Sequence, residues 1–453
     1  MSLRVGIVGT GYVGLTTGIC LAHLGHQVTC LDTDAAKIAR LSSGKAPFFE
    51  PFLDEMLRQV KLEYSQSYES VVPHCDVIFI AVGTPSRSDG TPNLDYLNAA
   101  ATSLGQNLGE HFTVIVNKST VPIGSGNWVE SIVREASEEK TGAKGAKRFA
   151  VASNPEFLRE GSALHDSLYP DRVVLGSDSS EAIELMYRLY RPLLEQKFPA
   201  PSFLPRPDTM EAVPLIATDL ASAELIKYAA NAFLALKISY INEIGSLAQR
   251  VGADVKSVAK GIGLDARIGT RFLQAGLGWG GSCFGKDTSA LVSTAQEYGL
   301  EMPIVKAAKL VNARQRELVV DRLLEALKIL KGRTVGLLGL AFKPNTDDLR
   351  DAPALDIARR LIERGAKVRA HDPVAVEVAR RQLPDLAIHW CEEVAQVVEE
   401  ADALVLVTEW QEYRELDWSS LKQHMRGSVL VDGRHFLDRK KLEAAGFQYF
   451  FVG

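Results

Sequence analysis

The sequence lacks any apolar run approaching the roughly 20 residues that span a membrane. It also lacks a signal-peptide pattern, because its first residues lead straight into a strand pattern. We therefore expect a cytoplasmic protein with no membrane partner. The net charge of -5 provides no overall positive field, which argues against nucleic acid as a partner. Any anionic ligand must then be held by a few placed cations.

Cysteine is scarce and scattered. Five residues, an odd number, include no Cys-x-x-Cys pair and no zinc-ligand spacing, so we expect neither a disulfide framework nor a metal site. Cys283 lies in a glycine-rich loop, which favours a functional role. The other four lie in or next to apolar patterns and are interpreted as small buried hydrophobes. They are Cys20, Cys30, Cys75 and Cys391.

What the sequence does contain is an alternation of apolar strands and helices that occurs twice. Such runs are typical of parallel sheets covered on both faces. Residues 219–250 contain no proline and predict one long helix of about 48 Å. The predicted strands lie at residues 4–9, 27–32, 76–82 and 113–117, and again at 334–339, 365–372, 401–408 and 428–432.

The fold class predicted from this layout is α/β, with two Rossmann-like, doubly wound parallel-sheet domains joined by a helical middle domain with a long central helix. The predicted boundaries are 1–205, 206–325 and 326–453. A helical middle between two nucleotide-type domains leaves a cleft, the usual place for a ligand.

The motif GTGYVG at residues 9–14 follows a predicted strand and opens a predicted helix. Gly9 would make the tight turn, Gly11 would admit a pyrophosphate, and Gly14 would let the helix pack on the strand. Asp32, at the end of the next strand, would bind the adenosine ribose and repel a 2′-phosphate, which favours NAD over NADP. The corresponding segment at 339–344 lacks the third glycine, so the C-terminal domain should hold something other than a whole dinucleotide.

The segment GLGWGGSCFGKD at residues 276–287 has four glycines in six residues, which lets backbone amides approach a ligand. A helical pattern begins just after Cys283. A thiol at a helix N-terminus, with Lys286 nearby, should have a lowered pKa and act as a nucleophile. The alternative is a buried structural cysteine.

Two other polar pairs have both a structural and a functional interpretation. Asn154 followed by proline predicts the start of a short helix that would place Glu156 and Glu160 on one face. The alternative is a solvated acidic turn. Lys227 and Asn231 lie at i, i+4 on the long helix among apolar neighbours, where the lysine either snorkels or is functional.

Hydroxyls and cations also follow predicted strands. KSTVP at 118–122 follows a strand at the carboxyl end of its sheet, where ligands of such sheets bind. Phe342, Lys343 and Arg350 follow the first C-terminal strand, where cations could grip phosphates. A capping hydroxyl and a solvated basic loop are the respective alternatives.

Together these motifs resemble the UDP-glucose/GDP-mannose dehydrogenase family over essentially the whole chain. Ser282 stands where the N-acetylmannosamine branch usually has histidine. The UDP-glucose branch is most similar, through DARIG at 265–269, VTEW at 407–410 and VDGR at 431–434, while the GDP-mannose branch shares the serine and cysteine and stays an alternative. Gly285 departs from the proline often found there, which could loosen the helix start. The other matching motifs are VGTP at 82–85, NPEFL at 154–158, KYAAN at 227–231 and GGSCF at 280–284.

The resemblance implies NAD-dependent oxidation of the C6 alcohol of UDP-glucose to a carboxylate in two hydride transfers. Cys283 would attack the intermediate aldehyde, and Glu156 would help a water hydrolyse the resulting thioester. Lys227, Asn231 and a water held by Asp287 would surround the reacting oxygen. Thr120 completes the implied catalytic set.

The resemblance also implies binding residues. Lys37 would lie on the adenosine side of NAD, and Ser119 and Thr120 on the nicotinamide side. Arg267 and Arg434 would both reach a substrate, one of them in the partner subunit. The implied NAD contacts are Gly9, Gly11, Tyr12, Val13, Gly14, Asp32, Lys37, Thr84, Pro85, Ser119, Thr120, Glu160, Lys286 and Arg350. The implied substrate contacts are Glu156, Phe157, Leu158, Glu160, Lys227, Asn231, Arg267, Gln274, Gly278, Gly280, Phe342, Lys343 and Arg434.

Two other functional hypotheses remain open. One is a two-electron dehydrogenase with a bystander cysteine, and the other is a non-catalytic protein that senses NAD or a sugar nucleotide. The long apolar helix also suggests a homodimer or a larger homo-oligomer.

Overall fold

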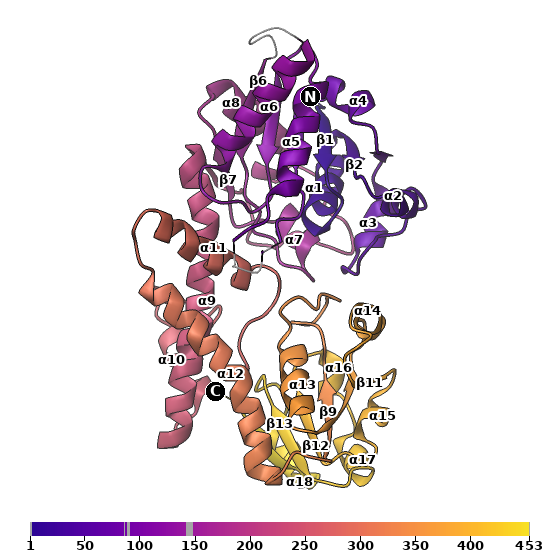
Figure 1. Ribbon diagram of the computed structural model, residues 1–453, viewed down its shortest axis with the longest axis vertical. Coiled ribbons are helices and arrows are strands. Elements are labelled where there is room, and N and C mark those ends of the chain that lie inside the picture. The colour runs from indigo at the N-terminus through magenta and orange to yellow at the C-terminus, as the bar shows by residue number, and fades with distance from the viewer. Residues whose placement is uncertain (1, 86, 88–90, 142–147, 453) are drawn as a thin grey trace. The chain divides into compact units, whose positions relative to one another are not determined.

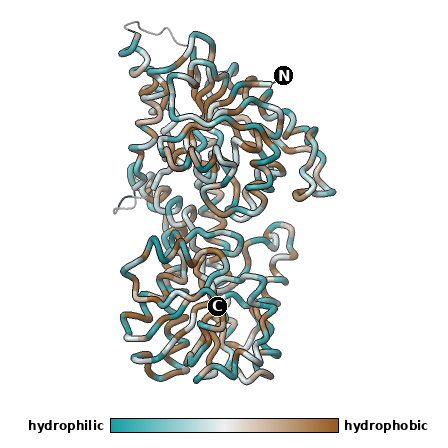
Figure 2. The backbone as a smooth tube through the Cα atoms, turned by 90° about the vertical axis from the view of Figure 1, so that its right-hand side faces the viewer, coloured by the Kyte–Doolittle hydropathy of each residue, from teal (hydrophilic) through white to brown (hydrophobic). Residues whose placement is uncertain are grey.

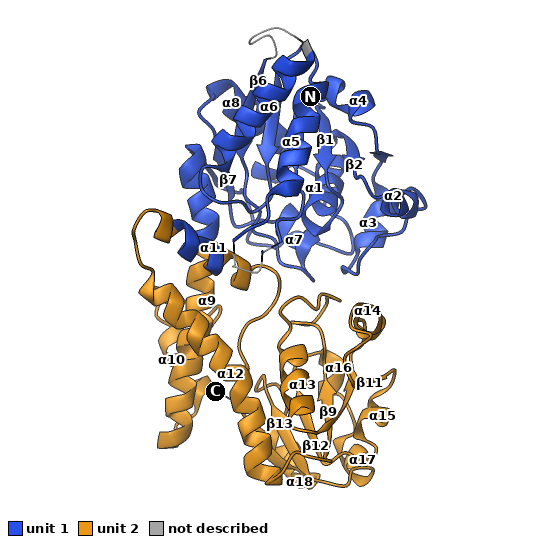
Figure 3. Ribbon diagram, in the orientation of Figure 1, with its two compact units in different colours: residues 1–229, 289–294 blue, residues 230–288, 295–453 orange. Residues whose placement is uncertain are grey.

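The computed structural model describes residues 2–85, 87, 91–141 and 148–452 (Figure 1). The chain forms two compact units (Figure 3). Unit 1 comprises residues 1–229 and 289–294, and unit 2 comprises 230–288 and 295–453. The predicted division into three domains stays a prediction.

Unit 1 is built on one sheet with the strand order β3-β2-β1-β4-β5-β6-β7-β8. All neighbouring strands are parallel except β6 and β7. The order reverses between β1 and β4, and ligands of such sheets bind outside the carboxyl ends of the strands at this point. The strands are β1 Arg4–Val8, β2 Gln27–Leu31, β3 Leu62–Ser65, β4 Val77–Ile80, β5 Thr113–Asn117, β6 Phe149–Ser153, β7 Val173–Gly176 and β8 Leu215–Thr218.

Both faces of this sheet are apolar and covered. In β4, Phe79 belongs to the cluster that includes Met186 of α8, whereas Ile78 and Ile80 belong to the cluster that includes Leu104 of α5. Alternate residues of a strand point to opposite faces, so a strand covered on both faces must be apolar throughout. The helices are α1 Tyr12–His23, α2 Ala35–Ser42, α3 Leu53–Gln59, α4 Tyr68–Val71, η1 Val72–His74, α5 Asp95–Asn107, α6 Ser125–Thr141, α7 Ala163–Leu168 and α8 Ser180–Leu194.

The predicted long helix is confirmed. Helix α9 extends over Leu220–Val251 and passes from unit 1 into unit 2. It is followed by α10 Val255–Gly263, α11 Phe284–Glu297 and α12 Pro303–Leu327. The helix predicted just after Cys283 is therefore confirmed as α11.

Unit 2 contains the second sheet, with the order β11-β10-β9-β12-β13-β14 and parallel pairs throughout. Strand β9 pairs with β10 and β12 as β1 pairs with β2 and β4, which confirms the predicted structural repeat. The strands are β9 Thr334–Leu338, β10 Lys367–His371, β11 Ile388–Cys391, β12 Ala403–Leu406, β13 Val429–Asp432 and β14 Gln448–Phe451. The helices are α13 Pro353–Glu363, α14 Val376–Gln382, α15 Val394–Val398, α16 Gln411–Arg414, α17 Trp418–Gln423 and α18 Arg439–Ala444.

Hydrophobic segments, brown in Figure 2, run through the interior of each unit. Among the helices that the structure describes, none has the length and apolarity that crossing a membrane requires. The α/β fold with two parallel sheets and a helical middle region agrees with the predicted class.

Candidate active site

The glycine turn after β1 has the three properties expected of a dinucleotide site. Gly9 has a φ of +99°, and a Cβ there would lie 2.6 Å from the Ala81 carbonyl oxygen. A Cβ on Gly14 would lie 1.9 Å from the Gly9 oxygen, so the helix could not pack on the strand. A Cβ on Gly11 would meet none of the described atoms within 4 Å. The protein itself therefore leaves space at Gly11, where α1 begins, and the start of a helix is a site that can bind phosphate.

Asp32 follows β2 and is held as an ionised carboxylate. Its Oδ2 accepts hydrogen bonds from the Thr10 amide (2.9 Å) and hydroxyl (2.6 Å), and its Oδ1 accepts one from the Asp34 amide (3.0 Å). Burial opposes ionisation, but these bonds and Lys37, whose Nζ lies 3.7 Å away, hold the pKa of Asp32 below its usual value. The acid at the second strand end thus fits a ribose of NAD.

Hydroxyl groups gather where β4 and β5 end. Thr84 Oγ1 donates to the Thr120 carbonyl (2.8 Å), and Ser119 Oγ donates to the Val82 carbonyl (2.7 Å). These residues therefore lie together at the point where the strand order reverses, on the side where the glycine turn opens. The residues present fit NAD, which supplies a hydride acceptor when bound.

Tyr12 and Phe157 have ordered surroundings in unit 1. The Tyr12 hydroxyl donates to the Phe49 carbonyl (2.9 Å), and its ring stacks on Phe48 with centroids 3.8 Å apart. The guanidinium of Arg172 lies 3.6 Å from the centre of the Phe157 ring. Both side chains are therefore positioned by the protein before any ligand arrives.

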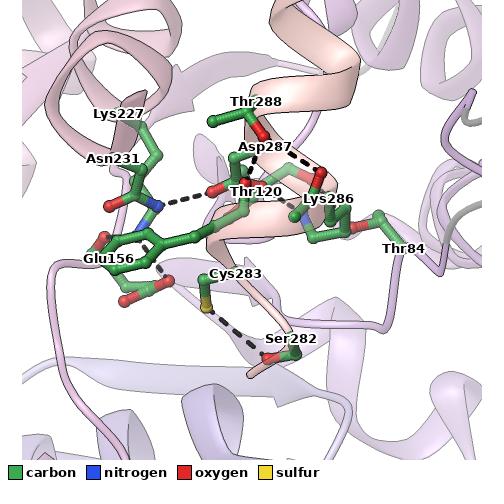
Figure 4. A network of polar contacts seen from close by, with 12 residues as sticks. Thr84, Thr120, Glu156, Lys227, Asn231, Ser282, Cys283, Lys286, Asp287 and Thr288 are labelled. Atoms are coloured by element: carbon green, nitrogen blue, oxygen red, sulfur yellow. Dashed lines mark hydrogen bonds and ion pairs between the residues drawn. The ribbon is translucent and has the colours of Figure 1, made fainter. Parts of the chain in front are cut away.

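Glu156 and Lys227 form a buried ion pair, shown in Figure 4. Lys227 Nζ donates to Glu156 Oε1 (2.8 Å) and to the Glu156 backbone oxygen (2.6 Å), and 5% and 7% of the two side chains are exposed. The second oxygen, Glu156 Oε2, has no hydrogen-bond partner among the described residues. One oxygen is therefore anchored and the other is available to accept a proton. The snorkelling interpretation of Lys227 is wrong, because its ammonium group turns inward to this carboxylate.

The short helix predicted from Asn154 is absent. Residues 154–160 are all described and none of them is helical, so Glu156 and Glu160 do not share a helix face. Asn154 does not act as a cap, because its Oδ1 accepts hydrogen bonds from Lys118 Nζ (2.9 Å) and from the Tyr190 hydroxyl (2.6 Å). These long-range bonds, and Lys227 on the Glu156 carbonyl, use the groups that a helix would have needed.

In unit 2, Asp287 lies between an amide and an ammonium group. Asn231 Nδ2 donates to Asp287 Oδ2 (2.6 Å), and Lys286 Nζ donates to Oδ1 (2.6 Å) (Figure 4). The Asp287 side chain is fully buried. Lys286, expected near the thiol, thus pairs with Asp287. A water held by Asp287 stays a prediction.

Cys283 occupies the N-cap position of α11, one turn before Asp287, whose amide donates to the Cys283 carbonyl (2.8 Å). Its Sγ lies 3.6 Å from Ser282 Oγ. It is partly exposed, whereas the other four cysteines are buried. Burial raises the pKa of Cys20, Cys30 and Cys75 to about 12, so these thiols are unreactive near neutral pH. The interpretation of the four as buried hydrophobes is confirmed.

The glycine-rich loop before Cys283 packs tightly against other parts of unit 2. A Cβ on Gly276 would lie 2.4 Å from the Gly433 oxygen, and one on Gly280 would lie 2.4 Å from the Asp351 oxygen. Gly281 has a φ of +86° and faces the Phe342 ring, 2.7 Å from a Cβ placed there. These glycines are therefore required by packing inside unit 2, whatever a ligand adds.

Arg434 joins this loop to the C-terminal sheet. Its Nη1 donates to the Gly278 carbonyl (3.0 Å), its Nη2 to the Phe342 carbonyl (3.4 Å), and its Nε lies 3.2 Å from Glu409 Oε2. Lys343 Nζ lies 5.3 Å from the Phe342 ring centre. The structure therefore brings together four of the residues implied for substrate binding. A direct contact of Arg434 with substrate stays a prediction.

Arg350 lies next to this cluster, because its backbone carbonyl accepts a hydrogen bond from the Gly281 amide (3.0 Å). Arg350 forms an ion pair with Asp348 (2.8 Å). Arg267 pairs with Asp265 (2.6 Å), and 89% of its side chain is exposed. Gln274 is exposed. Their roles toward NAD or substrate stay predictions.

The turn after β9 differs from the turn after β1. Asp372 Oδ2 accepts hydrogen bonds from the amides of Leu340 (2.7 Å) and Ala341 (3.0 Å) and from Trp410 Nε1 (3.1 Å). The Leu340 bond repeats the Thr10–Asp32 bond of the first turn, but Ala341, at the position of Gly11, also donates its amide to the carboxylate, and no helix begins directly after this turn. This supports the prediction that the second sheet does not hold a whole dinucleotide.

Sequence reasoning missed Glu224 and Tyr190. Glu224, on α9, accepts hydrogen bonds from the amides of Gly124 (2.6 Å) and Gly126 (2.8 Å) and so holds the segment after Thr120 to this helix. A carboxylate among apolar helix residues was the available signal. Tyr190 carried no signal, because its hydroxyl meets Asn154 only through the tertiary fold.

Comparisons with known proteins agree with this geometry. Residues 3–194 match the NAD binding domain of the UDP-glucose/GDP-mannose dehydrogenase family, 221–314 its central domain and 336–439 its UDP binding domain. UDP-glucose 6-dehydrogenase TuaD of Bacillus subtilis is 43% identical over 454 residues, covering 99% of this chain and 93% of the relative. UDP-glucose 6-dehydrogenase of Rhizobium meliloti is 43% identical over 459 residues, covering 100% and 99%.

A solved structure gives the same result. The UDP-glucose dehydrogenase of the hyperthermophilic archaeon Pyrobaculum islandicum aligns with a TM-score of 0.87 and 39% identity, covering 100% of this chain and 98% of that one. The three family domains occur in order along the chain, and the first contains the glycine turn with its acidic partner. This chain belongs to the UDP-glucose/GDP-mannose dehydrogenase family.

Proposed function

We propose that this chain is an NAD-dependent UDP-glucose 6-dehydrogenase, which oxidises the C6 alcohol to a carboxylate in two steps. The observation that carries the proposal lies on α9. Lys227 holds Glu156, and Asn231, one turn later, holds Asp287, which is itself one turn after Cys283. UDP-glucose is taken as the substrate from the relatives that are 43% identical over nearly their whole length.

In the first oxidation, the substrate alcohol loses a hydride, its hydroxyl proton passes to water, and it becomes an aldehyde. NAD, when bound, would supply the hydride acceptor for this oxidation and for the second one. Lys227 and Asn231 point from successive turns of one helix, so their ammonium and amide groups can donate to the oxygen that gains negative charge. A positioned donor of this kind contributes about 3–4 kcal/mol to such a step.

Cys283 would retain the aldehyde in the active site between the two oxidations. Its sulfur forms a bond to the aldehyde carbon, and the resulting thiohemiacetal stays attached while the cofactor is exchanged. After the second oxidation the sugar is held as a thioester. A partly exposed thiol on the first residue before α11 suits this role, whereas the four buried cysteines do not.

Glu156 completes the reaction. Its Oε2 takes a proton from water as the water oxygen bonds to the thioester carbon, and the carbon–sulfur bond breaks with the electron pair going to Cys283. Lys227 keeps Oε1 in place, so Oε2 is the oxygen left to act as the base. The products are the sugar carboxylate and the free thiol.

Counting NADH tests the proposal. With limiting UDP-glucose and excess NAD, two NADH per sugar are expected. One NADH per sugar would instead support a two-electron dehydrogenase with a bystander cysteine. If UDP-glucose gave no NADH but GDP-mannose did, GDP-mannose would be the substrate. If no nucleotide sugar gave NADH, the result would favour a non-catalytic protein that senses NAD or a sugar nucleotide.

We also propose a homodimer formed through α9, and a cytoplasmic location. Phe233, Tyr240, Leu247 and Val251 are 61%, 50%, 57% and 68% exposed, at spacings of seven, seven and four residues. These spacings place them on one helix face, and a contiguous apolar face of this kind is typical of an interface. Light scattering should give the dimer mass for the wild type and a monomer mass for Leu247→Glu. A monomeric wild type would refute the dimer.

A further inference from the structure

Lys118 is a lysine that the proposed mechanism does not use, although it lies close to the base. It directly follows β5, and Asn154, which it contacts, lies two residues before Glu156. Its Nζ donates one hydrogen bond, to Asn154 Oδ1 (2.9 Å), and lies 6.0 Å from the centre of the Tyr190 ring. No carboxylate forms an ion pair with it among the described residues. An ammonium group in such a setting has donors left for water.

A cavity of about 70 Å³ joins Lys118 to Glu156, because both residues line it. One water needs about 10–15 Å³ on the same measure, so the cavity has room for more than one. The lining also includes Asp166, Ser167 and Arg172, which are partly exposed. The cavity therefore extends from the buried base toward side chains that reach the surface of unit 1.

The surroundings of Lys118 favour its ammonium form over the neutral amine less than water does. Its pKa is lowered to about 8, mainly by burial and to a smaller extent by the charge of Lys227. Glu156 and Cys20 act in the opposite direction. The neutral amine is therefore present in a useful fraction near neutral pH.

Three other titratable groups that line the cavity keep one protonation state near neutral pH. Asp166 is kept ionised, because hydrogen bonds from Arg159 outweigh its burial and lower its pKa. Burial raises the pKa of Tyr190 above its ordinary value, so this phenol stays neutral. Arg172 remains charged at neutral pH. Apart from Glu156, whose protonation changes in the proposed reaction, Lys118 is thus the described group lining this cavity that can change its protonation near neutral pH.

The reaction releases protons that must leave the site. Each thioester hydrolysis leaves one proton on Glu156, and Glu156 can act again only after losing it. We propose that Lys118 accepts this proton from Glu156 through water in the cavity and passes it on to solvent. The Glu156 carboxyl group loses the proton, and the neutral amine of Lys118 gains it and becomes an ammonium group. The ammonium group then releases the proton to bulk water, so no other reactant is needed.

This inference rests on the proposed role of Glu156. Lys118 acts through that residue and touches neither substrate nor cofactor, so it is a positioning residue. Its substitution should slow turnover without changing the binding of UDP-glucose. A purely structural lysine, holding Asn154 in place, would be replaced well by arginine, which keeps the charge and the hydrogen bond.

The experiment compares Lys118→Met and Lys118→Arg with the wild type. In the wild type, kcat should rise with pH through about 8, because the neutral amine is the active form. Both variants should lose this rise and show kcat lowered about tenfold near pH 8, less than the 10²–10⁴ attributed to a direct acid or base. The first burst of NADH and the KM for UDP-glucose should be preserved, and quenched enzyme should carry a sugar thioester on Cys283.

Two controls separate the possible failures. Lys197→Met removes an exposed lysine, 75% of whose side chain is accessible, and should keep the wild-type profile. A Lys118→Arg variant with wild-type kcat and pH profile would overturn the relay and leave a structural lysine. Glu156→Gln should accumulate the thioester. If it turned over like the wild type, the proposed role of Glu156 would fail, independently of the result at Lys118.

Discussion

Alanine substitutions at Gly11 and Gly14 should have opposite consequences, although both lie in one motif. A Cβ at Gly14 would lie 1.9 Å from the Gly9 carbonyl oxygen, where the backbone must move by about 1.5 Å to restore an ordinary contact. Overpacking of this kind costs about 1–3 kcal/mol, and a backbone neighbour places Gly14→Ala at the upper end. For a unit of this size, about 3 kcal/mol lowers the Tm by roughly 6–12 °C.

Gly11→Ala should leave the fold almost unchanged. Its φ of -76° is accessible to alanine, and the added Cβ meets none of the described atoms within 4 Å. Replacing glycine by alanine at a helix N-cap costs at most about 1 kcal/mol, or roughly 2–4 °C in Tm. The methyl group would instead occupy the space where a pyrophosphate is expected, so the Kd for NAD should rise at least about tenfold, or 1.4 kcal/mol.

The assay measures two quantities for each variant. Thermal unfolding without ligand reports stability, and calorimetric titration with NAD reports the Kd. Gly11→Ala should change the Kd with little change in Tm, and Gly14→Ala should lower the Tm strongly. If Gly11→Ala bound NAD as tightly as the wild type, the open space at Gly11 would not be the pyrophosphate site, and the reasoning from the glycine turn would be refuted.

Three further predictions follow from single side chains. Cys283→Ala should bind UDP-glucose normally by calorimetry and give no net carboxylate product, and steady-state activity equal to wild type would contradict the covalent role. Asp32→Ser should narrow the preference for NAD over NADP in kcat/KM, because it removes the charge that repels a 2′-phosphate; an unchanged preference would place the ribose elsewhere. Burial raises the pKa of Glu224 to about 7, against the opposing amides of Gly124 and Gly126, so the folded state holds this proton more tightly than the unfolded state. Stability should therefore fall as pH rises from about 4.5 to about 7 and then level off, and this part of the Tm–pH slope should be absent in Glu224→Gln.

The strands, the repeat and the long helix could be predicted because their signals are local. Strands such as 77–80 are apolar throughout, and this pattern follows directly from coverage on both faces. The glycine motif was recognisable locally, and Gly14 is required by Gly9 in the same β1–α1 segment, whereas the close neighbours of Gly9 are Ala81 and Val82, which follow β4. The N-cap position of Cys283 followed from the helical pattern just after it.

The arrangement of polar partners was not local. The sequence predicted a helix at Asn154 from the usual capping rule, but the tertiary fold places Lys118 and Tyr190 against that side chain. Local propensity is worth about 1 kcal/mol at a cap, so several long-range hydrogen bonds outweigh it. The ion pair between Lys286 and Asp287 was likewise not predicted from the sequence.

The sequence by itself therefore determined the fold class, the dinucleotide motif and which cysteine stands apart from the four buried ones. Only the tertiary structure decided that Lys227 anchors one oxygen of Glu156 and that Asn231 and Lys286 both donate to Asp287. It also decided that Lys118 and Glu156 line one cavity. The physical reason is range: strands, turns and helix starts are specified by neighbours along the chain, whereas ion pairs and cavities form between segments that meet only after folding.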